Sequence, residues 1–171
     1  MHETADDLVA LQALLDSSYE RAGELLKRIT TPERRVDAAQ LTDRLTGMTL
    51  LVLATVTAEG RPRNGPVDGV FYRGSFCFGS APDSLRFRHI HQRPWVSATH
   101  IPAEEFAVTV HGRAVPIDVK SAGERDFRQA LLDVYIPLYG AGWEQFLDSG
   151  PTYARIDADR MFTFYMPAGG S

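Results

Sequence analysis

The segment at residues 79–89 carries side chains suited to binding a phosphate group. Ser80 and Ser84 precede a helical pattern whose first two turns hold Arg86 and Arg88. Free backbone N–H groups at a helix start, the positive end of the helix dipole and an arginine fork can together bind an anion. We expect Arg86 to be the principal ligand, with the two serine hydroxyls as further donors. The same residues equally fit a serine-capped helix with solvated arginines.

A second candidate region is the sequence NGPVDG at residues 64–69. Two glycines and a proline inside a strand pattern indicate either a bulged edge strand or a backbone that a flat ligand approaches closely. The residues by themselves leave both interpretations open.

Motifs for other common cofactors and catalytic sites are missing. The sequence has no GxGxxG, GxxxxGK[ST], GxSxG or HExxH pattern. His89 and His91 are two residues apart, and on a helix they point about 200° away from each other, so no metal site is expected. Cys77, the single cysteine, cannot form an intramolecular disulfide and is expected to be a buried small hydrophobe.

The composition fits one globular domain. The chain has 171 residues, of which 44% are hydrophobic, and a net charge of −4, which argues against binding to nucleic acid or to an anionic membrane. The longest purely apolar run, residues 50–54, is far shorter than the roughly 20 residues that span a bilayer. The acidic start of the chain does not resemble a signal peptide, so a cytoplasmic protein is expected.

The first 47 residues are expected to form a helical arm. Apolar residues recur with a helical period over residues 5–29, and Pro32 suits a first helical position. Asp37 and Gln40 have the spacing of a capping box, which predicts a short helix that ends before Gly47.

From residue 48 onward the pattern changes to short strands joined by tight turns. Strands are predicted at residues 48–57, 64–72, 75–79, 95–101, 105–117, 153–156 and 161–166, with turns at 58–60 and 73–74. A short helix is expected between residues 80 and 93, and Ser121 with Glu124 predicts a capping box for a later helix. Six or seven antiparallel strands with short connections favour a closed barrel, hence a mainly β fold.

Five sequence pieces, in order, resemble one known family. They are LVLATVTAEGRP at 51–62, PVDG at 66–69, FGS with SLR between 78 and 86, QRPWVS at 92–97 and VHGRA at 110–114. This series is similar to the pyridoxamine 5′-phosphate oxidase-like family, the FMN-binding split barrels. The resemblance covers residues 48–118, with a looser continuation over 152–167.

The resemblance implies a six-stranded antiparallel split β-barrel over residues 48–167, preceded by the helical arm at 1–47 and followed by a tail at 168–171. It also implies a homodimer with flavin bound at the subunit interface and the strand at 64–69 beside the isoalloxazine ring. Matched position by position, the cofactor-binding residues would be Asn64, Pro66, Val67, Asp68, Gly69, Ser80, Ser84, Arg86 and Arg88.

The sequence departs from the classical oxidases of this family. Leu85 stands where those enzymes often have a second basic phosphate ligand, and Asp68 or Gly69 stands where they have a lysine. Ala107 replaces a glutamine of the classical oxidases. The segment from Met166 to Ala168 does not match the C-terminal motif of those enzymes. Vitamin B6 oxidation is therefore not expected.

The expected function is a flavin-dependent oxidoreductase that acts on a small molecule, with FMN as cofactor or the deazaflavin F420 in its place. No side chain is singled out as a catalytic acid or base; His111, Tyr72, Asp68 and Trp143 are candidates to line a substrate cavity.

The alternative is a non-catalytic carrier or sensor of flavin or haem on the same fold. In a haem protein, the candidate axial ligands are His89, His100 and His111.

Overall fold

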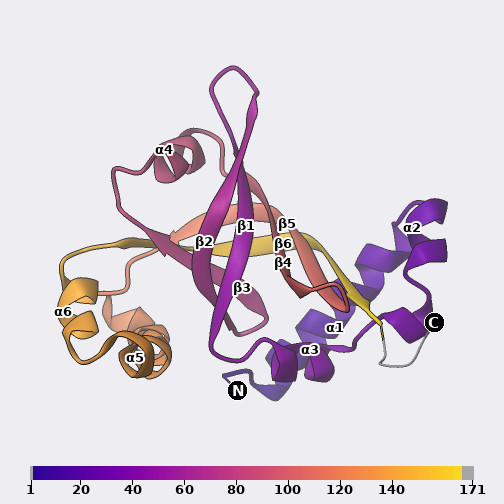
Figure 1. Cartoon of the computed structure of the whole chain (residues 1–171), viewed down its shortest axis with the longest axis horizontal. Helices are drawn as coiled ribbons and strands as arrows, with labels where there is room; N and C mark the ends of the chain where they lie inside the picture. Colours follow the sequence, from indigo (N-terminus) through magenta and orange to yellow (C-terminus); the bar gives the residue numbers. More distant parts are fainter. Residues whose placement is uncertain (1, 167–171) are drawn as a thin grey trace.

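The computed structural model describes residues 2–166, and within that range six strands form a closed antiparallel barrel (Figure 1). The strand order around the barrel is β1-β2-β3-β6-β5-β4. The strands are β1 (Met48–Val56), β2 (Pro62–Tyr72), β3 (Ser75–Ser80), β4 (Trp95–Ala103), β5 (Phe106–Ile117) and β6 (Thr152–Tyr165). The mainly β, six-stranded split-barrel prediction is confirmed.

The predicted turns form where glycine permits a left-handed backbone. Arg73 and Gly74 connect β2 to β3 with φ angles of 48° and 75°. Two successive positive φ angles match the right-handed twist of a hairpin, which is why this turn can be so short. Gly60, with φ 79°, lies in the longer loop that joins β1 to β2.

The last two predicted strands, 153–156 and 161–166, are one continuous strand. β6 pairs with β5 from Phe106↔Tyr165 to Ile117↔Tyr153, with a register shift between His111 and Gly112. The shift absorbs one extra residue of β6, so the polar segment at 157–160 stays in the strand. Polar residues on the solvent side of an antiparallel pair do not interrupt it, although they interrupt the hydrophobic pattern.

The helical arm consists of several short helices. The predicted helix at 5–29 is instead α1 (Ala5–Glu20) and α2 (Glu24–Ile29), separated at Gly23, whose backbone is extended. The 3₁₀ turn η1 (Pro32–Arg34) and α3 (Ala38–Arg44) follow. The capping box of Asp37 and Gln40 at the start of α3 is confirmed.

The arm packs into the core of the barrel. Leu11 and Leu15 of α1 and Leu41 of α3 belong to the same buried cluster as the barrel residues Phe76 and Val108. This burial stabilises short helices that would be marginal alone. No helix among residues 2–166 is long and apolar enough to cross a membrane.

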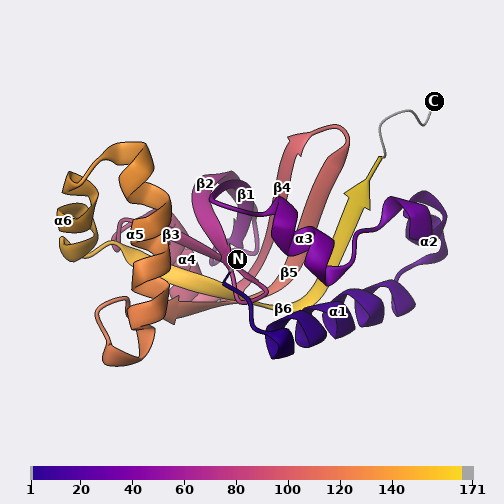
Figure 2. The ribbon, with the colours of Figure 1, turned by 90° about the horizontal axis from the view of Figure 1, so that it is seen from below.

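A second helical layer covers the opposite end of the barrel (Figure 2). It consists of α5 (Arg125–Tyr139) and α6 (Gly142–Asp148), which share a buried cluster with Val70, Cys77 and Tyr153 of the sheet. The predicted capping box of Ser121 and Glu124 does not form: a 3₁₀ turn, η2 (Ala122–Glu124), intervenes, and Ser121 makes no side-chain cap bond. Cys77 is buried, as predicted.

Candidate functional site

The helix α4 (Leu85–Gln92) lies beside the β1–β2 hairpin (Figure 1). Its Arg86 contacts β2 at Pro66. The Ser84 hydroxyl caps the helix by accepting a hydrogen bond from the backbone N–H of Phe87, at 3.3 Å. Phe87 is buried and stacks on Phe78 of β3, with ring centroids 5.9 Å apart. This packing anchors the first turn of α4 and so fixes the position of the Arg86 backbone.

The guanidinium of Arg86 brings two predicted site segments together. Its Nη2 donates to the carbonyl oxygen of Pro66 at 2.9 Å, and its Nη1 donates to Oγ of Ser80 at 3.4 Å. Partial burial lowers the pKa of Arg86 from its ordinary value, while the nearby Asp68 carboxylate raises it. An arginine stays protonated under physiological conditions, so this half-buried group remains a cation.

Two clefts meet at Arg86. The larger has a volume of about 680 Å³ and lies between the β1–β2 hairpin and α4. The smaller has a volume of about 230 Å³ and lies between β2, β3 and α6. Arg86 lines both of them. An anion bound to this arginine would therefore border both spaces.

The larger cleft has both polar and apolar walls and has room for a cofactor. Its lining residues are Leu53, Thr55, Thr57, Ala58, Glu59, Arg63, Asn64, Gly65, Leu85, Arg86, His89 and Gln92. The Oγ1 of Thr55 and Nδ1 of His89 are 2.9 Å apart, and Arg93 donates to the carbonyl oxygen of Ala58 at 2.9 Å. These bonds hold α4 to the hairpin, so the cleft has fixed walls. Its volume lies in the range typical of small-molecule and cofactor sites, roughly 300–1,000 Å³.

The predicted cofactor residues divide between the two clefts. Asn64 lines the larger one, and Pro66, Val67, Asp68 and Ser80 line the smaller one.

Three predicted residues lie outside both clefts. Arg88 is exposed on α4, and the Ser84 hydroxyl is engaged as the helix cap. Gly69 is buried, and a side chain there would clash with the carbonyl oxygen of Cys77 on β3. Close approach of the two strands therefore explains this glycine without a ligand. For Ser84, the simple capping interpretation describes the observed contact.

Several residues that line the clefts were not predicted from the sequence as ligands of a flavin cofactor. His89 lies three positions after Arg86 on α4, and residues at that spacing share a helix face. That spacing was available in the sequence. Phe146 and Tyr153 carried no such signal, because they reach the smaller cleft from elements far from Arg86 in the chain. Arg63, which lines the larger cleft, carried none either.

The substrate-cavity candidates are dispersed. Asp68 and Trp143 line the smaller cleft. Tyr72 borders a void of about 50 Å³ near α5, and His111 borders a separate groove of about 340 Å³ on the β4–β5 side of the barrel. The structure thus joins Asp68 to Trp143 and separates the other two from them.

The candidate haem ligands also lie apart. Each uses Nδ1 in a hydrogen bond: His89 with Thr55 Oγ1 at 2.9 Å, His100 with the Leu50 carbonyl at 2.8 Å and His111 with Ser97 Oγ at 2.8 Å. Because a carbonyl only accepts, His100 must carry its proton on Nδ1, which leaves Nε2 free as a possible ligand. Within residues 2–166 no cluster of three or more His, Cys, Asp or Glu is placed to hold a metal ion.

Solved structures share this fold, although no family model and no curated protein matches the sequence. A conserved hypothetical protein from Mycobacterium tuberculosis superposes with a TM-score of 0.63 at 16% identity, covering 82% of this chain and 96% of that chain. An FAD-binding protein from Mesorhizobium loti gives 0.57 at 19% identity, covering 78% of this chain and 98% of that one.

A haem-binding protein from Mycobacterium smegmatis gives a TM-score of 0.58 at 20% identity; the match covers 77% of this chain and 59% of that longer chain. These structures are split-barrel proteins of the pyridoxamine 5′-phosphate oxidase-like type, so the fold that the sequence motifs predicted is confirmed. Proteins of this fold include an F420 reductase as well as FAD-binding and haem-binding proteins. Identities this low show the shared fold alone.

Proposed function

We propose that this protein binds a phosphorylated flavin-type cofactor, FMN or in its place F420, and uses it as an oxidoreductase on a small molecule. The observation that carries the proposal is the position of Arg86, a half-buried cation fixed between Ser80 and Pro66 where two clefts meet. The chain offers a preformed anion site beside a space of cofactor size.

The residues at this site fit such a cofactor. A guanidinium has five N–H donors, and the two described bonds leave others for phosphate oxygens. Ser80 supplies a hydroxyl at the same point, and Asn64 and Gly65 border the larger cleft where the rest of the cofactor would lie. The cofactor supplies the redox chemistry when bound, and the protein binds and orients it.

The departures from the classical oxidases set the strength of binding. Leu85 is exposed and lines the larger cleft, at the position where the classical oxidases often have a second basic ligand. The nearby Asp68 carboxylate raises the pKa of Arg86, and its negative charge opposes a phosphate bound to that arginine. Arg63 lines the larger cleft and supplies further positive charge. We therefore expect the phosphate to be held mainly by Arg86, with affinity lower than two adjacent basic ligands would give.

A homodimer is proposed through the outer face formed by Leu50, Val52, Trp95 and Ile101, here called the β1–β4 face. All four are exposed, Leu50 to 61% and Trp95 to 57%. In the β1–β2 register Leu50 lies opposite Asp68 and Val52 opposite Pro66. Residues paired in this way share one face of a sheet. A second copy on this face would therefore border the smaller cleft.

The dimer is tested by the mass of the protein in solution. Val52→Arg places a charge in the middle of the β1–β4 face, and we expect it to shift a dimer to a monomer in analytical ultracentrifugation. Val9→Arg on α1 is a matched control, because Val9 is also exposed. A wild-type protein that sediments as a monomer contradicts this part of the proposal.

The cofactor is tested by titration of the purified full chain. FMN, F420 and haem are added separately, and binding is followed by visible absorbance and by calorimetry. We expect FMN or F420 to bind with a Kd below about 100 µM, equivalent to roughly −5.5 kcal/mol. Lack of binding by both contradicts the proposal. Bound flavin that no reductant reduces would favour a carrier or sensor in place of an enzyme.

One observation supports haem as the second candidate. His100 has Nε2 free and its ring fixed by the hydrogen bond to the Leu50 carbonyl, an arrangement that orients a ligating histidine. A Soret band that is lost in His100→Ala would support haem binding.

A further inference from the structure

The smaller cleft beside Arg86 has the walls of a site for an organic cation. Trp143 and Phe146 of α6 and Tyr153 of β6 line it, together with the Asp68 carboxylate from β2. Phe146 is 52% exposed, so its ring is open to solvent. Aromatic faces attract cations through their quadrupoles, and several aromatic rings around one point recognise quaternary ammonium groups.

The aromatic wall is rigid. The Trp143 ring stacks on the buried Tyr135 of α5 with centroids 4.5 Å apart and an interplanar angle of 15°. Phe146 packs beside Trp143, with centroids 6.0 Å apart. A wall built in this way keeps its shape before a ligand arrives, which lowers the entropic cost of binding.

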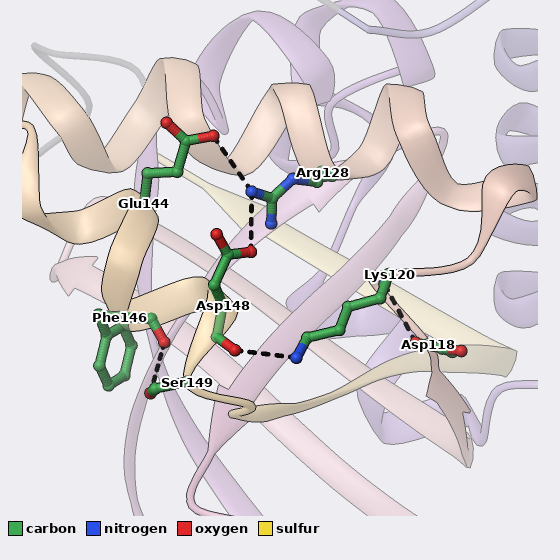
Figure 3. A network of polar contacts seen from close by, with 7 residues as sticks. All are labelled: Asp118, Lys120, Arg128, Glu144, Phe146, Asp148 and Ser149. Carbon is green, nitrogen blue, oxygen red and sulfur yellow. Dashed lines mark hydrogen bonds and ion pairs between the residues drawn. The ribbon is translucent and has the colours of Figure 1, made fainter.

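Polar contacts hold α6 in place behind this wall (Figure 3). Arg128 of α5 pairs with Glu144 at 3.1 Å and with Asp148 at 3.0 Å, both on α6. Lys120 donates to the carbonyl oxygen of Asp148 at 2.8 Å. These contacts anchor both ends of this short helix and so help to hold Trp143 in place.

The free charge in this cleft is negative once an anion occupies Arg86. Burial, followed by the neighbouring Asp68 charge, raises the pKa of the Tyr135 and Tyr153 hydroxyls, so both stay neutral. Arg86 is already bonded to Ser80 and Pro66, and a phosphate on its open side would neutralise it. Asp68 is then the remaining charge that faces the space.

We propose that the cleft formed by Asp68, Trp143, Phe146 and Tyr153, here called the aromatic cage, binds the alkylammonium group of a small-molecule ligand. Its volume of about 230 Å³ exceeds the 150 Å³ or so that a benzene-sized molecule occupies in an engineered cavity. The inference rests on the proposed function in one respect: phosphate on Arg86 removes the competing positive charge. The substrate class of the proposed oxidoreductase is then an organic amine.

The test compares choline with its uncharged isostere, 3,3-dimethylbutan-1-ol, on the full chain. The protein has two tryptophans, so Trp95→Phe leaves Trp143 as the only indole reporter. We expect choline to change the Trp143 fluorescence saturably, and to bind roughly tenfold more tightly than the isostere because only choline has a cation–π attraction. NMR saturation transfer to the choline methyl protons gives a second reading that needs no tryptophan. Equal binding of the two compounds overturns the aromatic cage.

Two substitutions and a control locate the site. Asp68→Asn keeps the shape and removes the charge, and Phe146→Leu removes an exposed ring; each is expected to weaken choline binding several-fold. Asp43→Asn changes an exposed acid on α3, which does not line the cleft and lies away from α6 (Figure 2), and it should leave binding unchanged. Choline binding that survives both Asp68→Asn and Phe146→Leu overturns the proposal.

The two proposals fail in different ways. Inorganic phosphate should tighten choline binding in the wild type but not in Arg86→Ala. Asp68-dependent choline binding in a protein with no affinity for FMN or F420 supports the aromatic cage and contradicts the cofactor. Cofactor binding with no preference for choline over its isostere supports the cofactor and overturns the aromatic cage.

Discussion

Nη2 of Arg86 donates a 2.9 Å hydrogen bond to the carbonyl oxygen of Pro66 and so joins the start of α4 to β2. The bond fixes a cation at the meeting point of both clefts. Removing a charge-assisted phosphate contact costs about 1.5–3 kcal/mol. We therefore expect Arg86→Ala to weaken FMN or F420 binding by roughly 10- to 150-fold in calorimetric titration.

Arg88→Ala is the matched control for this prediction. Arg88 is exposed on the same helix and lines neither cleft. Its removal should leave the affinity nearly unchanged. If Arg88→Ala weakens binding as much as Arg86→Ala does, the anion site is placed on the wrong face of α4.

The hydroxyl of Tyr19 anchors the helical arm to the barrel. It donates to the carbonyl oxygen of Thr163 at 2.7 Å and accepts from the Thr163 backbone N–H at 2.8 Å, and both contacts are buried. Tyr19→Phe leaves these backbone groups unpaired, which costs about 1–3 kcal/mol. Urea unfolding should show this loss. Tyr139→Phe, on an exposed tyrosine, should change stability by less than about 0.5 kcal/mol.

Gly112 lies at the register shift, where the backbones of β5 and β6 approach closely. A side chain there would clash with the carbonyl oxygen of Asp157 and lie 2.8 Å from Cα of Ala158. Both neighbours are backbone atoms, which cannot move aside without disturbing the strand pairing. Gly112→Ala should therefore lower the free energy of unfolding by about 1–3 kcal/mol or more. Gly123→Ala, where nothing lies within 4 Å, should lack this loss; an equal loss there would contradict the steric explanation.

Stability should fall at alkaline pH because three buried acidic groups resist ionisation. Burial raises the pKa of the Cys77 thiol to about 12 from its ordinary value of 9.0, and the pKa values of Tyr135 and Tyr153 are raised as well. Above pH 9 the unfolded chain releases the thiol proton while the folded chain keeps it. The free energy of unfolding then decreases by about 1.4 kcal/mol per pH unit for this thiol, up to its folded pKa.

Cys77→Ala separates the thiol from the tyrosines. The ordinary pKa of tyrosine is 10.0, so between pH 9 and 10 the thiol dominates the predicted decrease. The substitution should remove most of the pH dependence in that interval when unfolding is measured by urea titration. An unchanged slope would contradict a buried, protonated thiol. Folded wild-type protein should also resist alkylation at pH 8.

The parts of the fold that local sequence determines were predictable. The capping box of Asp37 and Gln40 needs only two side chains three residues apart. The Arg73–Gly74 turn needs only a residue pair that accepts positive φ angles. Along β1, buried and exposed residues alternate, and a period of two follows from the geometry of any strand with one buried face. These features depend on neighbours in the chain.

The candidate site was predictable only in part. The serine and arginine pattern located Arg86, and the NGPVDG segment located Pro66, because each lies in a short motif. The sequence alone did not show why residue 69 is a glycine, because the reason is the close backbone of another strand, β3. The sequence pattern predicted two strands where the structure has the single strand β6. The polar residues in the middle of β6 stay extended because they pair with β5, and the hydrophobic pattern does not show this pairing.

The sequence by itself therefore determined the first five barrel strands, the start of α3 and the identity of the anchoring arginine, because hydrogen bonds and periodicity within a few residues specify them. Only the tertiary structure decided that Arg86 lines two clefts and that Trp143 and Phe146 line the smaller one together with Asp68. Trp143 and Phe146 lie 75 and 78 positions after Asp68 in the chain. Barrel closure and the packing of α6 bring them together, and neither leaves a mark in local sequence.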